Sequence, residues 1–143
     1  LEAMARPDEA LGEYQKAHAL SGDARLLPAM ANCAVLLGLH SRAIEWYSAF
    51  LEKEPRHTEA LFGLANAYQI RRDYGGALAA YRAVLSIDSA HARTYYNLGS
   101  LYAYHLGNPD SARFYWGAFL KRFPTSEDAP YIKREIRKLT PIH

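Results

Sequence analysis

The chain has 143 residues, half of them apolar and 22% charged, with a mean hydropathy of -0.27. These values indicate one domain or a short array of smaller folded units, and they argue against a disordered chain and against a two-domain enzyme. The formal net charge of +2 is too close to neutral to predict nucleic-acid binding, and no apolar run approaches the roughly 20 residues of a membrane-spanning helix.

The first predicted element is a helix from Pro7 to Leu20. Its apolar residues Ala10, Leu11 and Tyr14 have the spacing of the second helix of a two-helix repeat that recurs three times later in the chain. A lone second helix exposes the face that its missing partner would cover. We therefore expect residues 7–23 to be half of an incomplete repeat, and the natural protein to continue upstream.

A repeat with a period of 34 residues follows this helix. Its three copies are residues 24–57, 58–91 and 92–126, and the third has one inserted residue near His105. Each copy is predicted to form a helix, a tight turn and a second helix. Three columns of the repeat are the small residues Ala31, Ala65 and Gly99, the small residues Ala43, Ala77 and Ala112, and the bulky residues Tyr47, Tyr81 and Trp116.

The helices and turns follow from side-chain periodicity and size. In the second copy, apolar residues recur at i, i+3, i+4 and i+7 from Leu61, and residues 72–74 interrupt the pattern; this spacing is typical of an amphipathic helix. Gly38 and Gly107 stand in the corresponding turns, where a positive φ favours glycine. The small columns allow two helix backbones to approach closely, and the bulky column is predicted to pack between one helix pair and the next.

A last helix is predicted from Ala129 to Leu139, within a capping segment at residues 127–143. Residues 121–138 carry an excess of three positive charges, which can attract an acidic partner but which we interpret as the solvated face of a cap. The polar residues assigned to this helix are Lys133, Arg134, Glu135, Arg137 and Lys138, and the other basic residues of the segment are Lys121 and Arg122.

These features together resemble tetratricopeptide repeats (TPRs). The 34-residue period, the paired small columns, the aromatic column and the terminal prolines Pro55 and Pro124 match the pattern of that family. The best copy is residues 58–91, in which Ser89 replaces the terminal proline. The resemblance implies an all-α fold, a right-handed superhelix of antiparallel helix pairs, or α-solenoid. The departures are bulky residues in a column that is usually small, namely Phe50, Val84 and Phe119.

The resemblance also implies a non-catalytic module for protein–protein interaction, which binds a peptide or protein segment in a concave groove lined by the first helices. Asn66 and Asn97 can offer amide groups to a peptide backbone, and Phe62, Tyr96 and Tyr104 can offer apolar area. The alternative is that asparagine is merely common in these columns. The residues expected to line the groove are Arg25, Asn32, Glu59, Phe62, Asn66, Gln69, Arg93, Tyr96, Asn97, Ser100 and Tyr104.

Some members of the family clamp the C-terminal carboxylates of chaperone tails with Lys and Arg at fixed groove positions. Asn32 and Arg93 match that arrangement, but Pro28 and Asn97 occupy the places of two cations. Chaperone-tail recognition is therefore not expected.

Catalytic and metal-binding motifs are missing from the sequence. It contains no dinucleotide-binding, P-loop, zinc-protease or nucleophile-elbow motif, so we expect no enzymatic activity, no cofactor and no metal. His57 and His91 fall in equivalent turns between repeats, where exposed loop histidines are expected. The single cysteine, Cys33, lies on an apolar helix face and is expected to be a small buried residue.

Two further functions stay open. Apolar solenoid ends invite a second copy of the chain, which would make the protein a self-associating scaffold. Residues 119–139 are similar to the closing repeats of periplasmic and lipoprotein TPR proteins, which suggests a bacterial envelope assembly factor. The expected partner is a protein or an extended peptide, with neither nucleic acid nor membrane insertion. A single cysteine leaves the compartment open between cytoplasm and periplasm.

Overall fold

The computed structural model describes residues 6–139, and every regular element within that range is a helix. The chain divides into two compact units, residues 1–83 and 84–143, whose boundary falls within helix α6 (Tyr74–Ile87). The predicted all-α fold class is confirmed.

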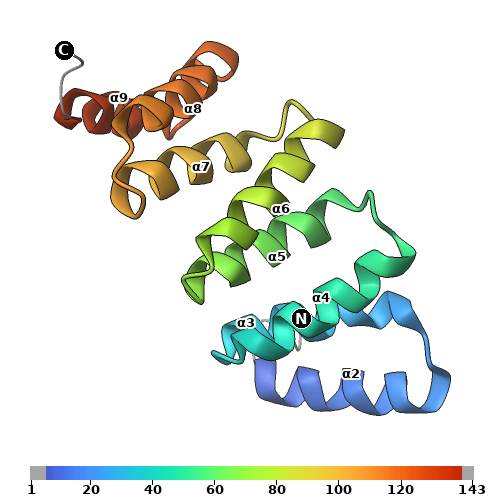
Figure 1. The fold of residues 1–143 in the computed structure, drawn as a ribbon. Helices are drawn as coiled ribbons and strands as arrows, with labels where there is room; N and C mark the ends of the chain where they lie inside the picture. The colour runs from blue at the N-terminus through green and yellow to red at the C-terminus, as the bar shows by residue number, and fades with distance from the viewer. Residues whose placement is uncertain (1–5, 140–143) are drawn as a thin grey trace. The chain divides into compact units, whose positions relative to one another are not determined.

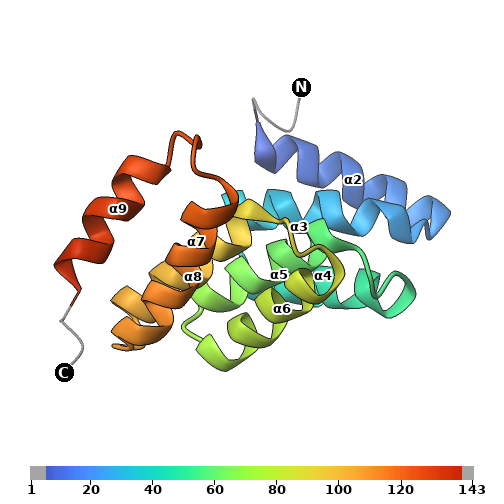
Figure 2. The ribbon, with the colours of Figure 1, turned by 90° about the horizontal axis from the view of Figure 1, so that it is seen from above.

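Unit 1 contains four complete α-helices, a short 3-10 helix and most of α6. Within it, α3 (Leu27–Leu36) and α4 (His40–Lys53) lie side by side (Figures 1 and 2). In unit 2 the corresponding pair is α7 and α8. The helices of unit 1 are α2 (Pro7–Ser21), η1 (Ala24–Leu26), α3 (Leu27–Leu36), α4 (His40–Lys53), α5 (Thr58–Ile70) and the greater part of α6 (Tyr74–Ile87). Unit 2 holds the end of α6, α7 (Ala92–Tyr104), α8 (Pro109–Arg122) and α9 (Ala129–Lys138).

Local sequence signals explain where several helices begin and end. Pro7 stands in the first turn of α2, where its fixed φ suits the helix and its missing N–H is not needed. This helix stops at Gly22, whose φ of 66° is left-handed. At the start of α8, the Asn108 side-chain oxygen accepts a hydrogen bond from the Ser111 amide at 3.0 Å, which satisfies a backbone donor left over at the helix end.

The turn between the two helices of a repeat has a left-handed residue at its centre. Gly38 and Gly107 have φ values of 78° and 57°, which confirms the role predicted for these two glycines. Arg72 adopts the same conformation in the turn between α5 and α6, with a φ of 64°. Because Arg72 carries a Cβ, this residue is strained in a way that the two glycines are not.

The core of unit 1 joins small residues and one large aromatic ring. Ala31 and Ala43 are completely buried, and Tyr47 on α4 is 3% exposed. A Cβ added at Gly63 on α5 would lie only 2.5 Å from Cζ of Tyr47. The glycine therefore allows the Tyr47 ring to lie directly on the α5 backbone, and the predicted roles of the small and bulky columns are confirmed here.

The core of unit 2 contains an even closer contact between a glycine and an aromatic ring. Trp116 on α8 is completely buried, and a Cβ added at Gly99 on α7 would lie 2.1 Å from its Cδ1 atom. The indole Nε1 donates a hydrogen bond to the Tyr96 carbonyl at 3.1 Å. Glycine at position 99 thus provides the space that the larger Trp116 ring needs.

Two sequence expectations about polar side chains are wrong, and one about a thiol is confirmed. His91 is buried rather than exposed, because its Nδ1 lies 2.8 Å from the hydroxyl of the buried Thr94. Glu135 is buried rather than on the polar face of the last helix, because it accepts a hydrogen bond from Tyr104. Cys33 is buried as expected, and burial raises the pKa of its thiol.

Within the described residues, no helix combines the length and the apolar character that crossing a bilayer requires.

Candidate functional site

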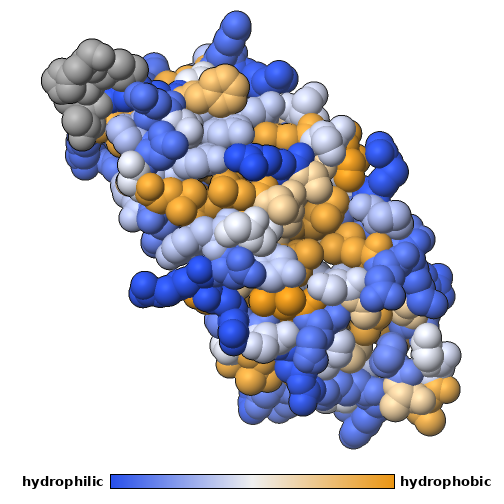
Figure 3. All heavy atoms as spheres, in the orientation of Figure 1, coloured by the Kyte–Doolittle hydropathy of each residue, from blue (hydrophilic) through white to orange (hydrophobic). Residues whose placement is uncertain are grey.

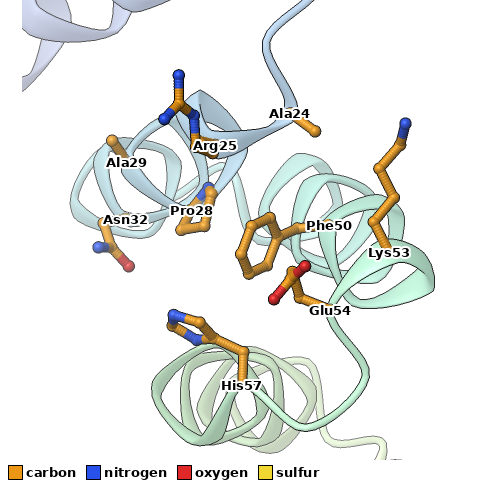
Figure 4. A pocket seen from close by; sticks show the side chains of 9 residues that line it. All are labelled: Ala24, Arg25, Pro28, Ala29, Asn32, Phe50, Lys53, Glu54 and His57. Atoms are coloured by element: carbon orange, nitrogen blue, oxygen red, sulfur yellow. The ribbon is translucent and has the colours of Figure 1, made fainter.

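A pocket of about 700 Å³ opens on unit 1, between the start of α3, the end of α4 and the start of α5. Its volume lies within the range of roughly 300–1,000 Å³ that is usual for ligand sites. The apolar side chains of this pocket include a phenylalanine and a proline, and its polar side chains carry charge of both signs. The lining residues are Ala24, Arg25, Pro28, Ala29, Asn32, Phe50, Lys53, Glu54 and His57 (Figure 4). We call this the unit 1 pocket.

Arg25 is positioned by a residue just before the pocket. The Asp23 carboxylate accepts a hydrogen bond from the Arg25 backbone amide at 2.9 Å and forms an ion pair with the Arg25 guanidinium at 2.9 Å. The hydrogen bonds from the Arg25 guanidinium and from the Arg25 backbone amide hold the pKa of Asp23 below its ordinary value. The positive charge of Arg25 is therefore already paired, on the protein surface.

His57 closes one side of the unit 1 pocket because it caps α5. Its Nδ1 accepts a hydrogen bond from the Ala60 amide at 3.1 Å, which fixes the ring at the start of the helix. The His57 ring meets the Phe50 ring edge to face, with centroids 5.0 Å apart. Phe50 is buried, so the two rings form a fixed aromatic wall.

Asn32 connects the unit 1 pocket to the core. Its side-chain oxygen accepts a hydrogen bond from the Tyr47 hydroxyl. Burial raises the pKa of Tyr47 to about 12, so this hydroxyl stays protonated near neutral pH and remains a donor.

The site residues predicted on α5 make contacts within unit 1. The Tyr81 hydroxyl donates to the side-chain oxygen of Asn66 and lies 3.0 Å from that of Gln69. Phe62 is buried, with its ring centroid 5.9 Å from that of Tyr81, whereas Glu59 is exposed. Asn66, Gln69 and Phe62 therefore support the helix packing of unit 1, and none of them lines the unit 1 pocket.

Unit 2 has a smaller pocket of about 300 Å³, formed by α7, the end of α8 and the segment that leads into α9. Three predicted site residues, Arg93, Tyr96 and Asn97, lie together in it. The Tyr96 ring stacks on Tyr131 of α9, with centroids 6.1 Å apart. The lining residues are Ala92, Arg93, Tyr96, Asn97, Phe119, Ser126 and Asp128. We call this the unit 2 pocket.

The last two predicted site residues make contacts inside unit 2. Ser100 donates a hydrogen bond to the Tyr96 carbonyl at 3.1 Å. The Tyr104 hydroxyl donates to the Glu135 carboxylate and lies 3.0 Å from the Tyr131 hydroxyl. Burial, followed by the bond to Glu135, raises the pKa of Tyr104. The Ser100 bond thus lies within α7, and the Tyr104 bonds join α7 to α9.

The two pockets are built at equivalent positions of the repeat. Arg25 and Phe50 in the unit 1 pocket correspond to Arg93 and Phe119 in the unit 2 pocket. The second copy has Glu59 in the column of these arginines. A carboxylate and an amide line each pocket as well, so the same kinds of side chain recur in both units.

All of the predicted site residues belong to the first helices predicted from the sequence. The residues of second helices and turns that also line the two pockets were not predicted. The phenylalanine column was a usable signal, since Phe50 and Phe119 stand where the repeat usually has a small residue. The walls missed in this way are Phe50, Lys53, Glu54 and His57 in unit 1, and Phe119, Ser126 and Asp128 in unit 2.

Residues 6–139 contain no group of three His, Cys, Asp or Glu side chains that could hold a metal ion. On the face drawn in Figure 3, hydrophobic and hydrophilic residues are interspersed.

Comparison with protein families identifies the repeats. Residues 58–91 and residues 93–126 each match a family model described as tetratricopeptide repeat. A comparison with curated proteins gave no match.

Solved structures with the same fold are TPR proteins of low sequence identity. A crystal structure of MamA is 20% identical with a TM-score of 0.85, and the match covers 94% of this chain and 77% of that one. YrrB, titled a TPR protein with an unusual peptide-binding site, is 23% identical with a TM-score of 0.83, and the match covers 92% and 68%. The first TPR of Spaghetti, bound to an HSP90 peptide, is 19% identical with a TM-score of 0.70, covering 83% and 94%.

Proposed function

The chain is a tetratricopeptide repeat protein, and we propose that it is a non-catalytic interaction module that binds an extended peptide or protein segment. The observation that carries this proposal is the unit 1 pocket, which lies on the first helix of a repeat and has an aromatic wall. The peptide-binding site named for YrrB and the peptide bound to the Spaghetti domain support a segment as the ligand.

The chemistry of the unit 1 pocket fits part of such a segment. Phe50, Pro28 and Ala29 supply apolar contact, and Asn32 and Glu54 supply polar groups. A site with mostly apolar walls and a few fixed polar groups is typical of ligand recognition, since the apolar area gives affinity and the polar groups give orientation.

A pocket-filling variant tests the proposal. Ala29→Trp places an indole in the unit 1 pocket, and Ala79→Trp places the same side chain at an exposed position of α6 as a matched control. The wild-type chain and both variants are immobilised and panned against a phage-displayed library of random twelve-residue peptides. Circular dichroism first verifies that the three proteins have equal helicity.

We expect wild type and Ala79→Trp to enrich the same peptides, and Ala29→Trp to lose them. If Ala29→Trp captures these peptides as well as wild type does, or if wild type enriches none, peptide binding at this pocket is refuted.

Self-association is the second candidate, because large apolar side chains are exposed at the ends of two helices of unit 1. Leu20, near the end of α2, is 90% exposed, and Leu36, the last residue of α3, is 67% exposed. Exposed apolar area of this kind can be covered by a second copy. Light scattering across a hundredfold range of concentration distinguishes self-association from monomeric peptide binding. The molar mass of a self-associating scaffold rises with concentration, and that of a monomeric peptide binder does not.

A further inference from the structure

The charged side chains of the unit 1 pocket differ in direction. In Figure 4 the Glu54 carboxylate, the Asn32 amide and the His57 ring are turned toward the middle of the pocket. The Lys53 ammonium and the Arg25 guanidinium extend away from it. A count of charges along the lining would give a positive balance, but the charge that faces the pocket is negative.

The ion pair between Arg25 and Asp23 keeps the positive charge of Arg25 turned away from the pocket. Both oxygens of the Asp23 carboxylate receive hydrogen bonds from the guanidinium, at distances from 2.9 to 3.2 Å. Two parallel bonds of this kind fix a guanidinium in place and satisfy its charge. Turning Arg25 toward a ligand would break them, so Arg25 is poorly placed to receive a carboxylate.

The walls next to Glu54 suit a flat cation on an apolar stem. Phe50 offers an aromatic ring, and Pro28 offers an apolar surface on the opposite helix (Figure 4). An arginine side chain packs its methylene stem against such surfaces and stacks its guanidinium on an aromatic ring. The same guanidinium forms two hydrogen bonds to one carboxylate.

We propose that the unit 1 pocket binds an arginine side chain of the partner segment, with its guanidinium paired to Glu54 and its stem against Phe50 and Pro28. This inference rests on the proposed function and adds the kind of residue that is recognised. The unit 2 pocket supports it, because Asp128 lines that pocket beside Phe119 and Asn97. A carboxylate, an amide and a phenylalanine thus occur together in both units.

The test uses three tripeptides that differ only in the middle residue: acetyl-Leu-Arg-Leu-amide, acetyl-Leu-Glu-Leu-amide and acetyl-Leu-Met-Leu-amide. Each is titrated into the full ¹⁵N-labelled chain, and dissociation constants are obtained from NMR shifts of the Phe50, Glu54 and His57 amides. We expect the arginine peptide to bind about two- to fivefold more tightly than the other two, the range of an exposed charge pair.

Two variants locate the cause of that preference. Glu54→Gln is expected to reduce the affinity for the arginine peptide to that for the methionine peptide. Glu52→Gln, the same change at an exposed position of α4 outside the pocket lining, is expected to leave the preference intact. Neither side chain is buried, so both variants should fold.

The inference is overturned if the glutamate peptide binds most tightly, if the preference survives in Glu54→Gln, or if no tripeptide shifts these amides. Its failure is separable from that of the proposed function. If library peptides still lose binding in Ala29→Trp, the proposal of segment binding stands. Only the recognition of an arginine side chain is then refuted.

Discussion

The Tyr81 hydroxyl donates a hydrogen bond to the side-chain oxygen of Asn66, and one repeat earlier Tyr47 makes the same bond to Asn32. Each bond ties the second helix of a copy to its first helix within unit 1. A residue that sequence analysis assigns to peptide contact thus also holds its own helix pair together. Substitution of either asparagine would disturb helix packing, so the proposed pocket is better tested at Ala29.

Removing one tyrosine hydroxyl should weaken unit 1. Tyr47→Phe is expected to lower the free energy of unfolding by about 1 kcal/mol at pH 7, because Asn32 loses its buried donor. Urea unfolding followed by circular dichroism measures the change. An unchanged midpoint would show that this bond contributes nothing to stability.

The same variant should alter the dependence of stability on pH. Burial raises the pKa of Tyr47 from 10.0 to about 12, so above pH 10 the folded chain keeps a proton that the unfolded chain releases. This contribution is present below pH 10 and is lost as the pH rises toward 12. Wild type should therefore lose stability more steeply than Tyr47→Phe in urea unfolding between pH 9.5 and 11.5, and parallel curves would contradict the assignment.

Two glycine substitutions in unit 2 should have opposite effects. Gly99→Ala forces a Cβ to within 2.1 Å of the buried Trp116 ring, and such overpacking costs about 1–3 kcal/mol. Gly117→Ala on α8 meets nothing within 4 Å and should stabilise the helix by about 0.5–1 kcal/mol. Thermal unfolding of both variants measures the difference, and equal melting temperatures would refute the close contact between α7 and α8.

The turn at Arg72 should be improved by glycine. Arg72→Gly relieves a left-handed backbone at an exposed position and is expected to stabilise the chain by about 0.5–1 kcal/mol. Gly38→Ala imposes the same strain where glycine now relieves it, and should destabilise by about 1 kcal/mol. Differential scanning calorimetry checks both signs. A lower melting temperature for Arg72→Gly would mean that its side chain contributes more than its backbone costs.

The fold could be predicted from the sequence because its main determinants are size and period. The small columns and the bulky column recur at a fixed spacing, and helix packing depends on just these properties. The turn glycines were predictable for a similar reason, since their backbone requirement is local. Arg72 was not, because no side chain marks a strained left-handed residue.

The candidate site was only partly predictable, because it depends on side-chain directions. Arg25 and Asn32, two of the residues predicted to line a groove, lie in the unit 1 pocket, but the direction of Arg25 is set by its bonds to Asp23. His57 lines the pocket only because its ring caps α5. Neither fact follows from helical periodicity, which assigns a residue to a face without fixing its rotamer.

The most direct test of the proposed peptide binding is an NMR map of a library peptide on the ¹⁵N-labelled wild-type chain. We expect the largest shifts on residues of the unit 1 pocket, including Arg25, Asn32, Phe50, Glu54 and His57, and we expect Ala29→Trp to abolish them. Large shifts confined to α2 or to the exposed face of α6, with these five residues unchanged, would contradict it.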